Sequence, residues 1–220
     1  MAAKHARSPH ISHSDLMLAT PASKPFDRPG WVYELKYDEF RLLAMREPDA
    51  ARLVSRRGND LADCFPEIVA CLRDLPNMVL DAELVVLDSQ GKPDFERLRR
   101  RALIKKAINV QHAARAEPAA LFAFDVLAWR GKDVRNLPLL KRKEIVEKAL
   151  RGAPRIRPVQ YVGEQGQRLY EAASGLDLEG IIAKRADAPY RAGRSKDWVK
   201  IRTPHGRHAQ DERSERWNER

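Results

Sequence analysis

A lysine between two carboxylates is the first feature of this sequence that could carry out chemistry. Side chains alternate between the two faces of a strand, so the alternating stretch 31–37 predicts Glu34, Lys36 and the following Asp38 on one face. A lysine amine becomes a nucleophile only after it loses its proton, which burial or neighbouring cations favour. This strand alone fits either a covalent active site or an exposed row of charges.

Further predicted strands carry charged residues inside apolar runs. These residues are Glu83, Asp125, Glu179, Lys184, Lys200 and Arg202. A charge in an apolar strand is costly unless it is paired or used, so each is a candidate site residue, although ordinary placement at a sheet edge would explain any one of them. Carboxylates bind Mg²⁺, and lysine and arginine bind phosphates, so the set indicates phosphoryl or nucleotidyl chemistry.

The elements that must position these residues alternate between strands and helices. Alternating apolar patterns predict strands at 31–37, 42–45, 51–54, 79–87, 121–129, 155–162, 178–185 and 197–202. Apolar residues at helical spacing predict helices at 63–75, 94–107, 139–150 and 168–176. We expect 1–20 to be a flexible tail and 204–220 a polar, disordered one. The order of elements predicts an α+β fold around antiparallel-rich sheets.

The composition excludes several classes of protein. The 220 residues contain two cysteines, too few and too far from paired histidines for a zinc site, and no apolar run approaches the ~18 residues of a membrane span. No apolar stretch follows the first basic residues, so we expect no secretory signal. The formal net charge of +10 favours a polyanionic partner, nucleic acid above all, and the stretch 94–107 is especially basic. That stretch fits a solvated helix face as well as a phosphate-binding one.

The order of six short motifs resembles that of ATP-dependent DNA ligases. The stretch 34–41 (ELKYDEFR) resembles the ligase motif K-x-D-G-x-R, and 55–58 (SRRG) resembles the S-R-x-G element that follows it. The remaining four motifs resemble 79–83 (VLDAE), 124–125 (FD), 179–184 (EGIIAK) and 198–202 (WVKIR). The sequence of these stretches is most similar to that of the ligase module of bacterial non-homologous end-joining ligases of the ligase D type. The resemblance covers about 21–203, which we expect to be the nucleotidyltransferase (adenylation) domain.

This resemblance implies an ATP-grasp-like nucleotidyltransferase fold of antiparallel sheets flanked by helices. It implies that Lys36 attacks the α-phosphorus of ATP to form lysyl-AMP, and that AMP then activates a 5′-phosphate for attack by a 3′-hydroxyl of DNA. It also implies ATP contacts by Glu34 to the adenine amino group and by Phe124 to the base. The remaining implied contacts to ribose, phosphate or metal are those of Arg41, Arg56, Glu83, Lys184, Lys200 and Arg202. Glu179, with Glu83, would bind Mg²⁺ or Mn²⁺.

Three positions depart from the family pattern. Glu39 and Ala82 stand where the motifs have glycine, and Arg202 stands in place of a lysine. Glycine often marks a positive φ or a close approach to a ligand, so Glu39 is expected to bring a side chain and a negative charge close to the nucleotide. Lys36, Glu83, Glu179 and Lys200 persist, which favours an active site.

Residues 203–220 are too few for the oligonucleotide-binding (OB) barrel that follows this domain in such ligases. We therefore expect the domain without its OB-fold, acting on nicked or broken double-stranded DNA in repair or recombination. An OB-fold or end-joining partner would be supplied in trans, in a bacterial cytoplasm near the nucleoid. One alternative is a catalytically weak or inactive DNA-binding remnant. Another is an RNA ligase or capping guanylyltransferase, which shares the lysine chemistry.

Overall fold

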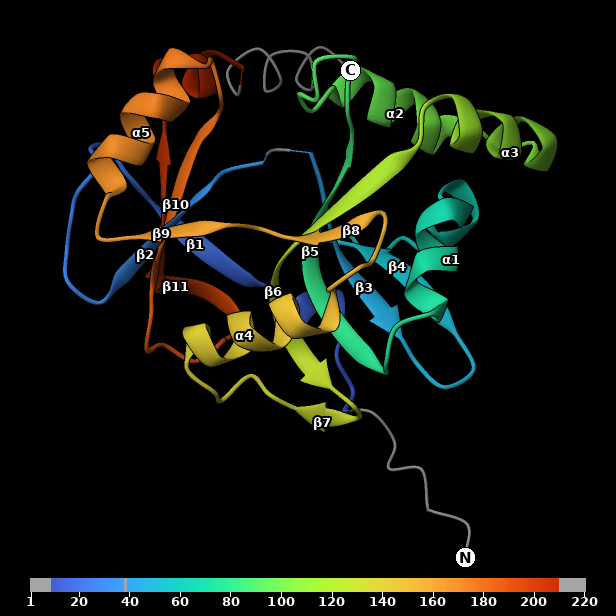
Figure 1. Cartoon of the computed structure of the whole chain (residues 1–220), viewed down its shortest axis with the longest axis horizontal. Helices are drawn as coiled ribbons and strands as arrows, with labels where there is room; N and C mark the ends of the chain where they lie inside the picture. Colours follow the sequence, from blue (N-terminus) through green and yellow to red (C-terminus); the bar gives the residue numbers. More distant parts are fainter. Residues whose placement is uncertain (1–8, 38, 210–220) are drawn as a thin grey trace, which may run out of the picture. The chain divides into compact units, whose positions relative to one another are not determined.

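The computed structural model describes residues 9–37 and 39–209, and their contacts divide into two compact units. Unit 1 contains the described residues of 9–16, 39–158 and 189–191. Unit 2 contains those of 17–37, 159–188 and 192–209. The chain therefore passes from one unit to the other several times, and each unit is built from segments that are distant in the sequence (Figure 1).

Unit 1 is built on a sheet in the strand order β4-β3-β5-β6-β7, with β8 paired to β6. Its strands are β3 (Phe40–Arg46), β4 (Ala51–Ser55), β5 (Met78–Val86), β6 (Ala119–Trp129), β7 (Lys132–Asp133) and β8 (Ile156–Pro158). The predicted hairpin of 42–45 and 51–54 is confirmed as β3 and β4, which pair antiparallel. The predicted strands at 79–87 and 121–129 are confirmed as β5 and β6.

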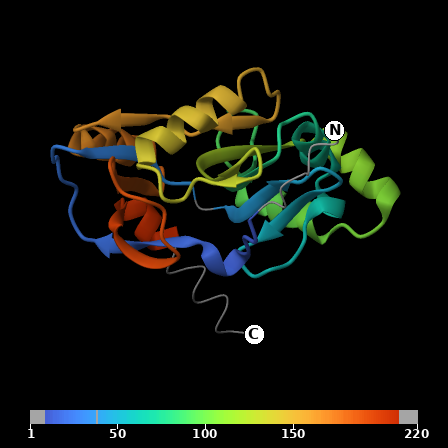
Figure 2. The same cartoon turned by 90° about the horizontal axis from the view of Figure 1, so that it is seen from below.

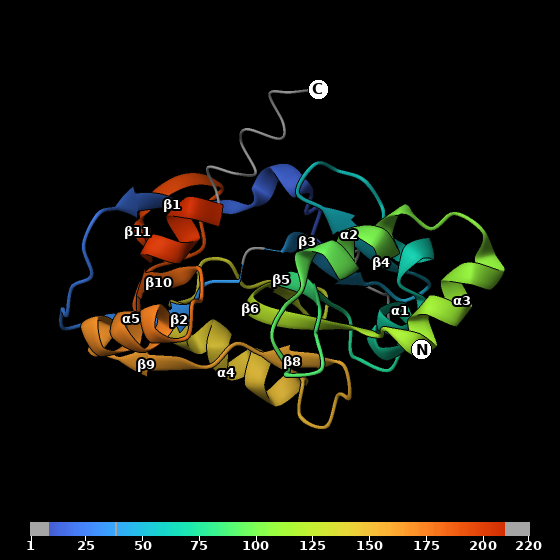
Figure 3. The same cartoon turned by 90° about the horizontal axis from the view of Figure 1, so that it is seen from above.

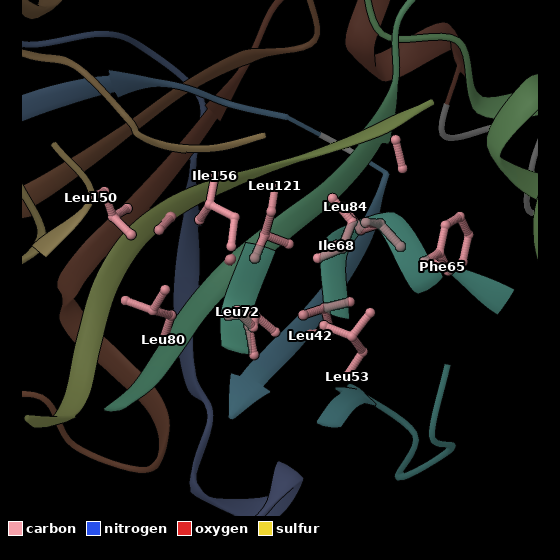
Figure 4. Close-up of a cluster of buried hydrophobic side chains, with 14 of the residues drawn as sticks. Leu42, Leu53, Phe65, Ile68, Leu72, Leu80, Leu84, Leu121, Leu150 and Ile156 are labelled. Atoms are coloured by element: carbon pink, nitrogen blue, oxygen red, sulfur yellow. The ribbon is translucent and has the colours of Figure 1, made fainter. Parts of the chain in front are cut away.

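Three helices pack into the core on the unit 1 sheet. They are α1 (Pro66–Arg73), α2 (Phe95–Leu103) and α4 (Leu139–Ala149). The helix α3 (Ala107–Ala116) contacts α1, and two short 3₁₀ turns are η1 (His13–Asp15) and η2 (Ala62–Cys64). Ile68 and Leu72 of α1 pack with Leu80 and Leu84 of β5 in the buried core (Figure 4). Because strand side chains alternate, Asp81 and Glu83 lie on the opposite face of β5.

Unit 2 is built on a second sheet, in the order β1-β11-β10-β2-β9. Its strands are β1 (Met17–Ala22), β2 (Trp31–Leu35), β9 (Tyr161–Gly163), β10 (Gly180–Arg185) and β11 (Gly193–Arg202). The helix α5 (Gly166–Gly175) packs on one face of β2 and β10, over Tyr33, Ile181 and Ala183 (Figure 3). Glu34 of β2 and Lys184 of β10 therefore occupy the other face.

Five sequence predictions need correction. The tail predicted for 1–20 is wrong from η1 onward, because β1 begins at Met17 and pairs parallel with β11. The helix predicted for 94–107 is two helices, since the backbone is extended at Ile104 and Lys106. The strand predicted for 155–162 is split between the two sheets as β8 and β9. The strand predicted for 31–37 ends at Leu35. Residues 204–209 are helical rather than disordered (Figure 2); 1–8 and 210–220 lie outside the described residues.

The α+β class itself matches the structure, with antiparallel pairing in both sheets and parallel pairing at β1–β11 and β6–β8. No helix in the described part of the chain is long and apolar enough to cross a bilayer.

A buried ion pair joins α4 to β6 in unit 1. Arg142 donates from Nε and Nη2 to the two carboxylate oxygens of Asp125, at 2.7 and 2.9 Å, and both side chains are fully buried. Asp125, predicted as a candidate site residue, is therefore held by a structural partner. Removing one partner of such a pair leaves the other charge buried without compensation.

We expect Arg142→Met to destabilise the protein by about 3–5 kcal/mol, because Asp125 would keep its burial and lose its counter-charge. Urea unfolding measures this change. The control is Lys141→Met on the same helix, whose pair with Glu144 is more than half exposed and which should change stability by less than about 1 kcal/mol. Equal effects of the two substitutions would show that burial of Asp125 without Arg142 does not carry the expected cost in stability.

Candidate active site

Lys36 lies directly after β2, where its backbone N–H donates to the carbonyl of Gly180 at 2.9 Å. Its Nζ donates to Oε1 of Glu179 at 2.7 Å, and the two side chains are only 9% and 10% exposed. Nε of Arg202 lies 3.5 Å from the same Glu179 oxygen. The structure thus joins the predicted nucleophile to a predicted metal ligand and a predicted phosphate ligand.

Strand pairing brings a second ion pair onto the same sheet. Nζ of Lys184 is 2.8 Å from Oε2 of Glu34, and it lies 4.1 Å from the centroid of the Trp198 ring. Lys200 is opposite Ile182, which is itself opposite Glu34, so Lys200 is on the face that carries Glu34. We call this set the lysine cluster. Its members are Glu34, Lys36, Glu179, Lys184, Trp198, Lys200 and Arg202.

The Tyr37 phenol is influenced by the charge of Glu34 in the lysine cluster. Burial, and then the negative charge of Glu34, raise the pKa of the Tyr37 phenol above its ordinary value. The phenol is therefore neutral at physiological pH. Asp38, which the alternation placed on the face of Lys36, lies outside the described residues.

The segment after β11 holds the backbone of Glu179. The Thr203 N–H donates to the Glu179 carbonyl at 3.1 Å, and the Thr203 hydroxyl donates to Leu178 at 2.6 Å and accepts from the Gly206 N–H at 3.0 Å. Gly206 packs so closely that an added Cβ would overlap the Glu179 carbonyl oxygen and lie 2.8 Å from its Cγ. Sequence reasoning missed this support, because 203–209 shows no apolar period.

In unit 1, Arg41 is fixed by a carboxylate on the neighbouring strand. Its Nε and Nη2 donate to Asp81 at 2.9 and 2.7 Å, and the hydroxyl of Tyr190 donates to the same carboxylate at 2.6 Å. Burial lowers the pKa of Arg41, but the charge and hydrogen bonds of Asp81 outweigh it and raise the pKa well above the ordinary value. The guanidinium also lies 5.3 Å from the centroid of Phe124.

A β-bulge sets the position of Phe124. The pairing of β5 and β6 steps from Ala82–Ala123 to Asp81–Asp125, so Phe124 is the extra residue of a bulge on β6. Such bulges re-aim side chains and are common beside active sites. Glu83 lies opposite Arg41 in the register and is buried.

Glu39, which stands where the family motif has glycine, contacts a predicted site residue through its backbone. Its N–H donates to Oε1 of Glu83 at 2.8 Å. The departure from the family motif therefore lies directly beside the Glu83 carboxylate.

Other predicted residues are less tightly joined. Arg56 is exposed just after β4, and its N–H donates to the Arg41 carbonyl at 3.0 Å. The two predicted metal ligands, Glu83 and Glu179, belong to different units. Within the residues that the structure describes, no group of three or more histidine, cysteine, aspartate or glutamate side chains is arranged to hold a metal ion. The nucleotide contacts expected of Arg41, Arg56, Glu83 and Phe124 remain predictions.

Comparison with protein families decides what these motifs belong to. The family model described as "ATP dependent DNA ligase domain" matches residues 16–202. The chain belongs to this DNA ligase domain family. The predicted resemblance is therefore confirmed, and its observed span begins a few residues before Pro21 because β1 is part of the domain.

Individual relatives of this ligase domain agree with the family model. It is 34% identical over 189 residues to the multifunctional non-homologous end joining protein LigD of Pseudomonas aeruginosa, covering 84% of this chain and 21% of that protein. It is 30% identical over 187 residues to the SPbeta prophage-derived DNA ligase-like protein LigB of Bacillus subtilis, covering 84% and 66%. The chain thus spans less than two thirds of the length of these relatives.

The fold is that of solved ligase domains. A structure of mycobacterial DNA ligase D complexed with ATP and MES superposes with a TM-score of 0.72 at 29% identity, covering 88% of this chain and 61% of that one. The α+β nucleotidyltransferase fold expected from the motifs is thereby confirmed.

We expect Gly206→Ala to destabilise the domain by about 1–3 kcal/mol, because the added methyl group would overlap the Glu179 backbone. It should also move Glu179 away from Nζ of Lys36. Urea unfolding measures the first effect, and the rate at which an amine-acylating reagent modifies Lys36, read by peptide mass, measures the second. The control is Gly175→Ala at the end of α5, where a Cβ meets nothing within 4 Å. If both variants behave alike, 203–206 does not support Glu179.

Proposed function

We propose that this domain uses Lys36 to take AMP from ATP as a covalent lysyl-AMP and passes it to DNA 5′-phosphates for sealing to 3′-hydroxyls. The carrying observation is the Lys36–Glu179 pair, a lysine amine held by a carboxylate at the end of a rigid strand beside Arg202. Membership of the ligase domain family and the end-joining and ligase names of its relatives support a role in DNA repair.

The lysine cluster offers each group that the first step needs. The neutral Lys36 nitrogen attacks the α-phosphorus, the N–P bond forms, and the bond from that phosphorus to the bridging oxygen breaks as pyrophosphate leaves with the electron pair. The ammonium must first lose a proton to solvent, which the neighbouring Arg202 cation favours, and Glu179, whose oxygen is 2.7 Å away, holds Nζ in position. Holding Nζ at one place converts a bimolecular encounter into a positioned attack.

The cations and carboxylates of the lysine cluster suit a metal-bound nucleotide. Lys200 and Arg202 are two residues apart on β11, so they lie on the same face, and both would contact the phosphates. Mg²⁺ commonly binds through one or two carboxylates together with substrate phosphates, so Glu179 with those phosphates fits Mg²⁺ or Mn²⁺. When bound, the metal supplies positive charge to the reacting phosphate.

Glu34 supplies a buried acceptor for the base. The side chain is 2% exposed, and an ionised carboxylate only accepts hydrogen bonds, so it would accept from the amino group of adenine. A guanine presents a carbonyl oxygen at the corresponding position and would be repelled. Preference for ATP follows.

We expect incubation with ATP and Mg²⁺ to add one AMP to Lys36 and Lys36→Ala to abolish the adduct. The substitution should leave the domain folded, because Arg202 still lies beside Glu179 and compensates its charge. Intact-mass spectrometry and peptide mapping measure the adduct, and circular dichroism checks the fold. The control is Lys24→Ala, an exposed lysine of the same unit.

Labelling that survives Lys36→Ala, or that maps to another lysine, would show that the nucleophile is misassigned. A folded wild-type chain that never gains AMP would favour a domain that binds DNA without catalysis.

The DNA partner is supported by charge as well as by family. The net charge is +10, and basic residues are concentrated on α2 and around the α2–α3 link. Arg97 and Arg99 form ion pairs with Asp94 and Glu96, whereas no ion pair joins Lys105 or Lys106 to another described residue. These two exposed lysines are the ones best able to contact DNA phosphates.

We expect weak, non-specific DNA binding by the 220-residue chain, with a dissociation constant of about 10⁻⁴ to 10⁻⁶ M at physiological salt. Replacing Lys105 and Lys106 together by glutamine should lower the slope of log K against log salt by roughly two. Fluorescence anisotropy with a nicked duplex measures both. The control replaces the exposed Lys141 and Lys148 of α4 and removes the same charge. Equal loss in both double variants would mean that only net charge matters.

A further inference from the structure

The register of three strands stacks Glu34, Lys184 and Trp198 on one face of the unit 2 sheet. Lys184 is the central member, opposite Val32 on β2 and opposite Trp198 on β11. Glu34 is two residues from Val32 and therefore projects to the same side. The other face of these strands carries Tyr33 and Ala183, which pack with α5.

Within this stack the Lys184 ammonium is enclosed by protein groups. Glu34 Oε2 is 2.8 Å from Nζ, the Trp198 ring centroid is 4.1 Å from it, and the Glu34 and Lys184 side chains are each only 2% exposed. A desolvated ammonium over an indole ring gains cation–π attraction in addition to the ion pair. By contrast, Lys200 on the same face is only partly buried.

We propose that Lys184 is a positioning residue for base recognition: it holds the Glu34 carboxylate ionised and oriented toward the adenine amino group, instead of contacting phosphates. This inference rests on the proposed function, in which Glu34 reads the base. Nζ contacts both groups at once, because the Trp198 ring centroid lies 4.1 Å and Glu34 Oε2 2.8 Å from it.

Removal of the ammonium should change which base is accepted. A buried carboxylate that loses a close counter-charge takes up a proton more readily or turns toward water. A protonated carboxyl group can donate a hydrogen bond to the guanine carbonyl, and a displaced one no longer repels it. Either change weakens ATP binding and relaxes the rejection of GTP.

The test compares kcat/KM for self-adenylylation with ATP and for self-guanylylation with GTP in wild type, Lys184→Met and Lys200→Met. We expect Lys184→Met to lower the ATP-to-GTP ratio by about tenfold or more, mainly by raising the KM for ATP. Lys184→Arg, which keeps the charge, should recover most of the ratio. Lys200→Met should lower kcat/KM for ATP and for GTP by similar factors, because both nucleotides would lose the same phosphate contact.

A double-mutant cycle links the effect to Glu34. If Lys184 acts through Glu34, Lys184→Met should add little to the loss of discrimination already caused by Glu34→Gln. If Lys184→Met does not fold, Lys184→Gln serves as the second variant, because it still donates a hydrogen bond to Glu34 without the charge and should give an intermediate ratio.

The outcomes separate this inference from the proposed function. Suppose that the wild-type chain forms lysyl-AMP and that Lys184→Met lowers kcat/KM for ATP and for GTP by the same factor. This result would overturn the positioning role of Lys184 and leave the proposed function standing. A wild-type chain that forms no adduct would overturn the proposed function. In that case calorimetry can measure the binding of ATP and GTP to Lys36→Ala, with and without Lys184→Met. An ATP-to-GTP affinity ratio that Lys184→Met leaves unchanged, or no binding of either nucleotide, would overturn the inference.

Discussion

An ionised side chain can stay on a buried strand face only beside a partner of opposite charge, and the arrangement of both sheets follows this constraint. Glu34 is paired with Lys184, Arg41 with Asp81, and Asp125 with Arg142. In each pair the partners come from different elements, so the pair also fixes how those elements register. Exchange of one partner alone leaves a buried charge, which explains why polar residues persist on strands that are otherwise apolar. The candidate chemistry uses groups that the fold already has to hold in place.

Local periodicity predicted the elements whose residues face a single environment. The period of two at 79–87 and the helical spacing at 63–75 depend on burial against the same sheet, and β5 and α1 lie where expected. The motif resemblance correctly identified the fold. The structure joins Lys36 to Glu179, and the roles of these two residues in catalysis stay a prediction. At the departure from the family motif, the Glu39 N–H donates to the Glu83 carboxylate.

The missed features depend on contacts between residues far apart in the sequence. β1 exists because it pairs with β11, and nothing within 17–22 alternates strongly enough to reveal that partner. The apolar pattern of 155–162 is continuous, yet β8 and β9 join different sheets, a division that no local period encodes. Tyr190 binds Asp81, 109 residues away, and no signal near Tyr190 indicates the partner. The polar composition of 204–209 suggested disorder, whereas the role of Gly206 depends on its fit against Glu179.

The position of Lys36 at the end of β2 reconciles rigidity with reactivity. The Lys36 N–H donates to the carbonyl of Gly180, the first residue of β10. Glu179, which binds Nζ, directly precedes Gly180, and Lys184 lies further along β10. One backbone hydrogen bond thus sets the spacing between the amine and its carboxylate partner. Gly180 has a φ of 152° and packs against the Ile201 carbonyl, so β11 approaches β10 closely at this point. Since Arg202 follows Ile201 directly, the same close approach brings its guanidinium to Glu179. The geometry around the amine is therefore a consequence of how the ends of β2, β10 and β11 meet.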